Sequence, residues 1–316
     1  MAKRHHKEKI LSQNISCELS RELSCDLSGK LFCFGLGYSA QNFIRHLEQQ
    51  SAGWRFSGSG RQAPAVPDPA IAHHIFNGKK PMTGAADILC DVTHMLISIA
   101  PQEAIGDPVL HHHTAEISKL RNLKWIGYLS TTGIYGDRKG DWVDEDSTPA
   151  PTSARGRQRL AAEQGWLALS DQLQVPVDIF RLGSIYGPGR GQLSNLLAGK
   201  LKKIIKPGQY FSRIHVADIA QILAAAMISA NPGRCYNLVD DMPTASPVVI
   251  DYICDLLGRP HLPAINIDDA EISPMMKSFY AENKRVRNDR IKQELGITLT
   301  YPTYKEGFSE LVRSLP

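Results

Sequence analysis

A loop of small residues near the start of the chain has the spacing that a bound diphosphate requires. Its order is Gly35-x-Gly37-x-x-Ala40. The first glycine permits a tight turn, the second lets the backbone approach a pyrophosphate, and the third small residue lets a helix pack on the preceding strand. The loop therefore predicts a dinucleotide site, and a tight turn without a ligand is the alternative. The predicted contacts are Gly35, Leu36, Gly37, Tyr38, Ser39 and Ala40.

The residue that follows the second strand indicates which dinucleotide is bound. An NAD site carries an acid about 20 residues past the glycines, on the ribose 2′-hydroxyl. No acid lies between Glu48 and Asp68, and the strand ends instead in Ser57-Gly58-Ser59-Gly60-Arg61. Arg61 can hold a 2′-phosphate by charge-assisted hydrogen bonds. We therefore predict NADP as the cofactor, with NAD less favoured; the alternative for Arg61 is a solvated loop arginine.

Two further groups of side chains could bind ions. Residues 184–217 contain basic residues and no acidic one, which favours a phosphorylated or carboxylated ligand, although a lysine-rich surface helix is the alternative. The basic residues are Arg190, Lys200, Lys202, Lys203, Lys206 and Arg213. The run His111-His112-His113 has no carboxylate or cysteine at metal spacing. For that run we expect a helix surface and no metal site.

The elements that must position these residues alternate between strands and helices. Apolar spacing predicts one helix that includes Ala40, Phe43, Ile44 and Leu47, and another over 159–173. Short apolar runs predict strands at 31–34, 54–57, 95–100, 125–129 and 175–182. Strands that alternate with helices indicate the α/β class and a doubly wound, Rossmann-type parallel sheet.

Four more blocks follow the glycine loop in a fixed order. They are STTGIYGD at 130–137, RLGSIYGPG at 181–189, RIHVADIA at 213–220 and YNLVDDMPT at 236–244. Together with the loop, these blocks resemble the extended short-chain dehydrogenase/reductase superfamily of the NAD(P)-dependent epimerase/dehydratase type. The resemblance covers about residues 31–308. It implies a Rossmann domain over 29–182 and 213–239, and a smaller C-terminal substrate lobe over 183–212 and 240–316.

The resemblance also implies site residues, and two of them break the family pattern. In the family, a Ser or Thr works with a Tyr-x-x-x-Lys pair that exchanges a proton and holds the nicotinamide ribose. Alignment places the Ser/Thr role on Thr131, the tyrosine position on Arg155 and the lysine position on Arg159. Arginine stays protonated and cannot act as a base near neutral pH. Arg155 can still polarise an oxygen and Arg159 can still bind the ribose; a solvated basic face, with Arg159 paired to Glu163, is the alternative.

Another group must then exchange the proton if catalysis is retained. The family blocks offer Tyr135, Tyr186 and His215, and His215 has the most suitable ordinary pKa. Packing with one hydrogen bond is the favoured interpretation of each tyrosine. The remaining contacts implied by the resemblance are Ile99, Ala100, Ser130, Arg159, Leu182 and Gly183 for the cofactor, and Tyr186, Arg190 and Arg213 for the substrate.

Composition limits what else the protein can be. The 316 residues are 42% hydrophobic, with a net charge of +4 and six cysteines that form no CxxC pair. These values argue against a disordered chain, a nucleic-acid partner, a disulfide framework and a zinc site. No apolar run is long enough to cross a membrane. We expect a cytoplasmic protein, a disordered tail over residues 1–28 and, as a weak expectation from the family, a homodimer.

Two functions fit these observations. The first is an NAD(P)-dependent oxidoreductase, epimerase or dehydratase that acts on a small anionic substrate. The second is a non-catalytic NADP(H)-binding sensor or regulatory protein, which would keep the glycine loop and lose the acid/base pair. The blocks that border the cleft favour the enzyme.

Overall fold

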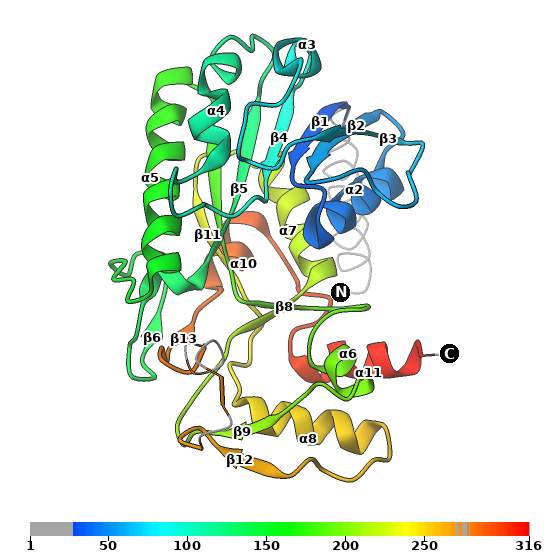
Figure 1. The fold of residues 1–316 in the computed structure, drawn as a ribbon, viewed down its shortest axis with the longest axis vertical. Coiled ribbons are helices and arrows are strands. Elements are labelled where there is room, and N and C mark those ends of the chain that lie inside the picture. The colour runs from blue at the N-terminus through cyan, green and yellow to red at the C-terminus, as the bar shows by residue number, and fades with distance from the viewer. Residues whose placement is uncertain (1–27, 270–271, 274–276, 278, 316) are drawn as a thin grey trace, which may run out of the picture.

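The computed structural model describes residues 28–269, 272–273, 277 and 279–315. Seven strands, all parallel, form a central sheet in the order β11-β7-β5-β4-β1-β2-β3 (Figure 1). They are β1 (Gly29–Phe34), β2 (Trp54–Gly60), β3 (Ile71–Ile75), β4 (His94–Ile97), β5 (Trp125–Thr131), β7 (Val177–Leu182) and β11 (Cys235–Leu238). The strand order reverses between β1 and β4, and the carboxyl edge at such a point is where ligands bind. The predicted doubly wound fold is confirmed.

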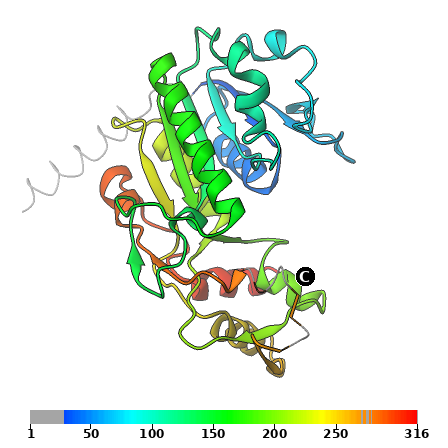
Figure 2. The ribbon, with the colours of Figure 1, turned by 60° about the vertical axis from the view of Figure 1, so that its left-hand side comes forward.

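Helices cover both faces of the sheet (Figure 2). α2 (Tyr38–Gln50) and α7 (Val216–Met227) bury their apolar residues in one core, and α3 (Ala85–Leu89), α4 (Pro108–Ile117) and α5 (Ala154–Leu173) do so in another. The central strand β1 is fully buried from Leu31 to Phe34, as a strand between two helical layers must be. Residues Ala40, Phe43, Ile44 and Leu47 all face the first core, as their spacing predicted.

The predicted strands agree in place with the observed ones and differ at their ends. β2 continues to Gly60, β4 ends at Ile97, and β7 begins at Val177, directly after Pro176. Neither edge strand of the sheet, β3 or β11, was predicted. The sequence of β3 is IAHHI and its residues are exposed or half-buried, so it contains no continuous apolar run.

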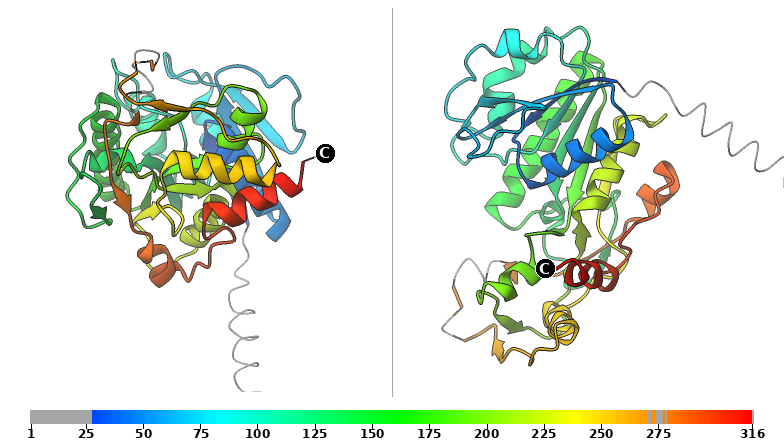
Figure 3. Two further views of the ribbon diagram at one scale, coloured as in Figure 1. Left: turned by 90° about the horizontal axis from the view of Figure 1, so that it is seen from below. Right: turned by 90° about the vertical axis from the view of Figure 1, so that its right-hand side faces the viewer.

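Shorter elements gather at the carboxyl edge of the sheet (Figures 1 and 3). Three parallel two-stranded ladders lie there: β8 (Ser184–Tyr186) with β10 (Arg213–His215), β9 (Lys203–Ile205) with β12 (Ala264–Asn266), and β6 (Trp142–Val143) with β13 (Arg285–Val286). The helices there are α6 (Gln192–Leu197), α8 (Ser246–Leu256) and α11 (Tyr304–Arg313), whereas α10 (Asp289–Leu295) packs beside β11 (Figure 1). α6, α8 and α11 share an apolar core of their own, which includes Leu196, Ile253 and Phe308.

The histidine run on α4 differs from the expectation of a helix surface. His113 is fully buried, and its Nε2 accepts a hydrogen bond from the Met82 N–H at 3.2 Å. It lies four residues from both Val109 and Ile117, which are buried on the same helix face. His113 therefore belongs to the core, and among the described residues no three His, Cys, Asp or Glu side chains come together as a metal site.

Three sequence predictions concern the N-terminal tail, membrane-spanning helices and disulfide bonds. The predicted tail lies outside the described residues, apart from Ser28. None of the described helices has the length and apolar character needed to cross a lipid bilayer. The four described cysteines, Cys33, Cys90, Cys235 and Cys254, are all free.

Candidate active site

The glycine loop joins β1 to α2 at the carboxyl edge of the sheet. Gly35 has a φ of +99°, and a Cβ on this residue would lie 2.6 Å from Ser98 Oγ. Only glycine takes this conformation and this contact without strain. The Leu36 N–H donates to the Ser59 carbonyl at 2.7 Å, so the loop is fixed against the end of β2.

Gly37 leaves open space at the start of α2. No atom lies within 4 Å of the position that a Cβ on Gly37 would occupy. No side chain caps α2 at Gly37, and no acidic residue lies in its first turn. Uncapped amides beside an open space suit a phosphate. These residues therefore fit the diphosphate of a dinucleotide.

A cleft of about 1030 Å³ extends from this space along the edge of the sheet. Residues 37–39, 129–133 and 182–185 line it from the sheet, and residues 153–156 line it from the start of α5. Residues 210–212 also line it. The charged side chains in its wall are Arg155, Arg159, Arg190, Glu282 and Lys284.

Thr131 and Ser130 stand side by side at the end of β5, where the 3₁₀ turn η1 (Thr132–Tyr135) begins. Both line the cleft. Thr131 Oγ1 accepts from the Gly133 N–H at 3.1 Å. The Ser130 hydroxyl donates to the buried Glu163 carboxylate. Thr131 thus keeps its hydroxyl hydrogen available to a ligand, whereas Ser130 is used in an internal hydrogen bond.

Arg155 and Arg159 share one face of α5 toward the cleft, as their spacing predicted. Arg159 Nη1 donates to the Tyr128 hydroxyl at 3.1 Å and to a carbonyl oxygen of β5 at 2.8 Å. The alternative pairing of Arg159 with Glu163 does not occur. The Glu163 carboxylate instead accepts from Arg181 Nη2 at 2.9 Å, and both residues are buried.

Comparison with known proteins identifies the family that this site belongs to. The model of the NAD dependent epimerase/dehydratase family matches residues 112–238, which include Thr131 and both cleft arginines of α5. A solved structure of a functionally unknown conserved protein from Silicibacter pomeroyi is 47% identical, with a TM-score of 0.81. The match covers 90% of this chain and 98% of that chain. The middle part of this chain, with Thr131 and the start of α5, therefore matches the NAD dependent epimerase/dehydratase family.

Two more distant relatives have names that state an activity. The dTDP-glucose 4,6-dehydratase of Bacillus anthracis, solved in complex with NAD, shares 19% identity and the fold, with a TM-score of 0.72 over 90% of this chain and 96% of that chain. An uncharacterized UDP-glucose epimerase of Bacillus subtilis, YtcB, is 22% identical over 164 residues. That match covers 51% of this chain and 45% of the relative, so the chain spans less than half the length of this curated relative.

Tyr135, one of the predicted proton carriers, lies outside the cleft lining. Its ring is fully buried, and its hydroxyl donates to Asn237 Oδ1 at 2.8 Å and accepts from Arg181 Nη1 at 2.9 Å. Burial raises the pKa of Tyr135 above its ordinary value. These contacts support the packing interpretation over a proton-transfer role.

Tyr186 and Arg213, both predicted to bind substrate, also lie outside the cleft lining. The Tyr186 ring stacks on Phe308 with centroids 4.8 Å apart, inside the core of α6, α8 and α11. Arg213 is 5% exposed and donates from Nη1 to the carbonyl oxygens of Phe211 and Thr244, each at 2.9 Å. The geometry assigns both side chains structural contacts.

His215, the favoured proton carrier, is the N-cap of α7. Its Nδ1 accepts from the Ala217 N–H at 3.2 Å. Its ring packs between Tyr186 and Tyr301, with centroids 5.1 and 4.0 Å away, and is 4% exposed. Burial lowers the pKa of His215 to about 4. The structure does not bring His215 into the cleft.

The predicted cofactor contacts divide into two groups. Those in the cleft wall are Gly37, Tyr38, Ser39, Ser130, Arg159, Leu182 and Gly183, together with Arg190 from the predicted substrate set. Those outside the lining are Gly35, Leu36, Ala40, Ile99, Ala100 and Arg61. Gly35, Leu36 and Ala40 belong to the glycine-loop motif. Ile99 and Ala100 follow Ser98 after the end of β4. Arg61 is exposed directly after β2.

Sequence reasoning did not assign Tyr210, Glu282 and Lys284 to the cleft wall, where the structure places them. Lys284 Nζ donates to the Gly136 carbonyl at 2.9 Å and to Glu282 Oε2 at 2.7 Å. The stretch Asn283-Lys284-Arg285 resembles the closing segment of the family, for which the sequence predicted only a structural role.

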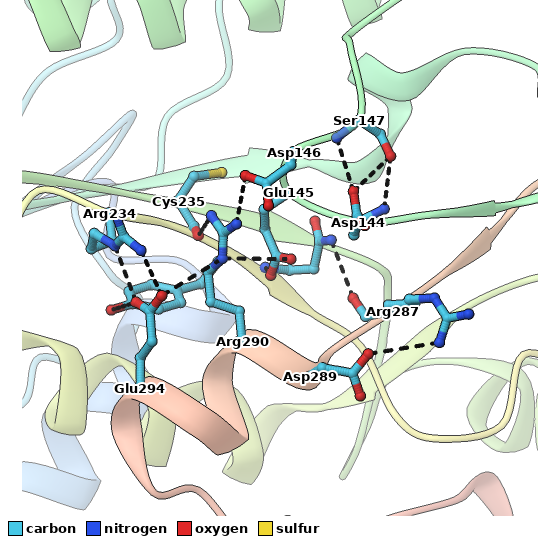
Figure 4. Close-up of polar contacts among 12 residues, drawn as sticks. Asp144, Glu145, Asp146, Ser147, Arg234, Cys235, Arg287, Asp289, Arg290 and Glu294 are labelled. Carbon is cyan, nitrogen blue, oxygen red and sulfur yellow. Dashed lines mark hydrogen bonds and ion pairs between the residues drawn. The ribbon is translucent and has the colours of Figure 1, made fainter.

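A cluster of charged side chains fixes the segment that follows η1 (Figure 4). Arg290 on α10 donates to Asp146 at 2.6 Å and lies 4.0 Å from Glu145. The Glu145 carboxylate is buried and accepts from the Asn237 N–H on β11 at 2.7 Å. These contacts tie the segment that follows η1 to β11 and α10.

Proposed function

We propose that this protein is an NAD(P)-dependent enzyme of the oxidoreductase, epimerase or dehydratase type, and that its substrate is small and anionic. One observation carries the proposal: a single cleft joins the glycine loop, Thr131 and the arginines of α5. The relatives whose names state an activity are a dehydratase and an epimerase, which supports this class.

The cofactor would lie with its diphosphate at Gly37 and the first amides of α2. Arg159 and Ser130 would lie beside its nicotinamide ribose. When bound, the nicotinamide accepts or supplies a hydride. Thr131 would donate a hydrogen bond to the substrate oxygen from its available hydroxyl, and Arg155 would polarise that oxygen with its guanidinium.

An anionic substrate is supported by the charge of the cleft wall. Arg155, Arg159 and Arg190 line it, and none of them forms an ion pair with a described carboxylate. Uncompensated guanidinium groups in a concave site attract phosphate or carboxylate groups. Of these three arginines, Arg159 would contact the cofactor, and Arg190 and Arg155 would contact the substrate.

We propose that residues 183–212 and 240–316 form the substrate lobe. A cytoplasmic location and a homodimer also remain predictions.

NADP is proposed over NAD because of the residues at the end of β2. Arg61 is exposed two residues after Ser59, whose carbonyl oxygen holds the glycine loop. We expect Arg61→Ala to weaken NADPH binding roughly tenfold and to leave NADH binding within about twofold, because only NADPH carries the 2′-phosphate. Isothermal titration calorimetry with both nucleotides measures this. Equal losses for NADPH and NADH would contradict the assignment of Arg61.

Catalysis is tested with NADPH and a panel of carbonyl compounds, some phosphorylated, some carboxylated and some neutral. The assay follows absorbance in the band of the reduced nicotinamide. We expect turnover with anionic members of the panel. A protein that binds no pyridine nucleotide in calorimetry would refute the proposal.

A non-catalytic NADP(H) sensor is the second candidate, and the arginines at the tyrosine and lysine positions favour it. Arg155 and Arg159 cannot exchange a proton near neutral pH. Tight NADPH binding without turnover of any carbonyl or sugar-nucleotide compound would support this function.

A further inference from the structure

The cleft of this protein must contain a proton carrier if the proposed enzyme function holds. Arg155, Arg159 and Arg190 remain charged near neutral pH. Among the described side chains of the cleft wall, the groups that can exchange a proton are Tyr38, Tyr210, Glu282 and Lys284. The hydroxyl of Tyr38 is already used, since it donates to the Pro188 carbonyl at 3.1 Å. Three candidates remain.

Lys284 is largely enclosed, and its position is fixed. Its side chain is 11% exposed and that of Glu282 is 12% exposed. The ammonium donates to Glu282 and to the Gly136 carbonyl, which uses two of its three hydrogens. Glu282 is itself held by Thr152, whose hydroxyl donates to Oε1 at 2.7 Å.

The groups expected to contact the substrate oxygen all converge on the short turn η1. Thr131 is the residue from which η1 starts, and Lys284 binds the carbonyl of Gly136, where η1 ends. The start of α5 packs on the same turn, because a Cβ on Gly156 would lie 2.9 Å from the Gly133 carbonyl oxygen. Arg155 is the neighbour of Gly156. One turn of backbone therefore places Thr131, Arg155 and Lys284 around one part of the cleft.

We infer that Lys284 supplies the proton to the substrate oxygen, and that Glu282 positions it by holding its ammonium group. This inference rests on the proposed enzyme function. In the reducing direction, the bound reduced nicotinamide would supply the hydride that forms a C–H bond at the carbonyl carbon, so the carbonyl electron pair moves to the substrate oxygen. An N–H bond of Lys284 breaks, its electron pair stays on Nζ, and an O–H bond forms on that oxygen. Bulk solvent then returns a proton to the neutral amine.

Charged side chains of both signs surround Lys284. Glu282 is its direct partner, and Asp137 is a carboxylate on which both Lys206 and Lys284 act electrostatically. Arg155 and Arg159 line the same cleft. Glu282→Gln removes the closest carboxylate and keeps an oxygen for Lys284.

The first experiment needs neither the cofactor nor the true substrate. Pyridoxal 5′-phosphate is an anionic aldehyde that forms an imine, with loss of water, on an accessible neutral amine, and borohydride reduces that imine to a stable product. We expect peptide mass spectrometry to find Lys284 modified. In Glu282→Gln, labelling of Lys284 should be roughly tenfold faster, because the carboxylate that pairs with its amine is removed.

Lys202 serves as an internal reference because it is exposed and lies outside the cleft lining. Its labelling should be the same in the wild type and in Glu282→Gln. An unlabelled Lys284 beside a labelled Lys202 would overturn the inference. A pH dependence of Lys284 labelling that Glu282→Gln leaves unchanged would overturn the positioning role of Glu282.

The second experiment uses the carbonyl compound that gives turnover with NADPH. We expect Lys284→Met and Lys284→Arg each to lower kcat roughly hundredfold or more and to leave NADPH affinity unchanged. Arginine keeps the charge and cannot release a proton, so full activity of Lys284→Arg would overturn the inference. Lys202→Met, outside the cleft lining, should retain kcat within about twofold. A loss in Tyr210→Phe as large as that expected for Lys284→Met would assign the proton to Tyr210 and overturn the inference. Absence of NADPH binding to the wild type would instead refute the proposed function, and the labelling would still report on Lys284.

Discussion

His215 remains neutral because of where the fold places it. Its ring is buried between two tyrosines, and its Nδ1 accepts a backbone hydrogen bond at the start of α7. Burial lowers its pKa to about 4. The unfolded chain has an ordinary histidine pKa of about 6.5. Between these two values, the unfolded state binds a proton that the folded state does not.

Stability should therefore fall as the pH drops from about 6.5 to about 4, by up to about 3 kcal/mol from His215 alone. His215→Asn keeps a side-chain cap for α7 and removes the titration. We expect urea unfolding of this variant to show a correspondingly smaller loss of stability over that range. His94, whose pKa burial also lowers to about 4, titrates in both proteins and serves as the common background. Identical pH profiles would contradict the assignment.

At the scale of the elements, the loop between β1 and α2 contains one glycine with a structural role and one that faces the proposed ligand site. Gly35 has a positive φ, and its surroundings leave no room for a Cβ. Gly37 has an extended conformation with φ of −89° and faces open space. The two positions are two residues apart and can be tested as a matched pair.

We expect Gly35→Ala to lower the free energy of unfolding by about 1–3 kcal/mol, because alanine at this φ is strained and would contact Ser98. Gly37→Ala should fold with nearly unchanged stability and should weaken NADPH binding at least roughly tenfold, because its methyl group occupies the space offered to the diphosphate. Thermal unfolding and calorimetry measure the two effects. Normal NADPH affinity in Gly37→Ala would show that the diphosphate lies elsewhere.

The sequence predicted those elements whose signals are local. The glycine loop, the helix after it and the buried strands follow from spacing over ten or fewer residues, and the structure confirms them. The edge strand β3 and the burial of His113 were missed because their environments depend on distant segments. Lys284 and Gly136 are 148 residues apart, so no local pattern could place this lysine in the cleft. For the same reason, the positions of Tyr135 and His215 outside the cleft lining could not be derived from the family blocks alone.

At the scale of the whole molecule, α10 joins the sheet to the segment that follows η1 (Figure 4). Arg290 contacts Asp146, Glu145 and Glu294, and its side chain is 18% exposed. Arg287 nearby lies 3.8 Å from Asp289, and both side chains are more than half exposed. The two arginines differ mainly in burial. A variant of the exposed Arg287 can therefore serve as the control for the same variant of Arg290.

We expect Arg290→Met to lower the free energy of unfolding by about 2 kcal/mol, because the buried Glu145 carboxylate loses its cation. Arg287→Met should cost less than about 1 kcal/mol, as exposed ion pairs do. Urea unfolding measures both variants. Equal losses in the two would show that burial of the Arg290 cluster contributes nothing extra.

The short β6–β13 ladder has a consequence for how this protein can diversify. Lys284 stands immediately before β13, and this ladder is separate from the seven-stranded sheet that carries the glycine loop. Exchange of the short stretch around residues 279–287 between homologues could therefore install new reactivity while leaving dinucleotide affinity intact. The residues that bind the dinucleotide and the residues that supply the proton would then change independently of each other in evolution.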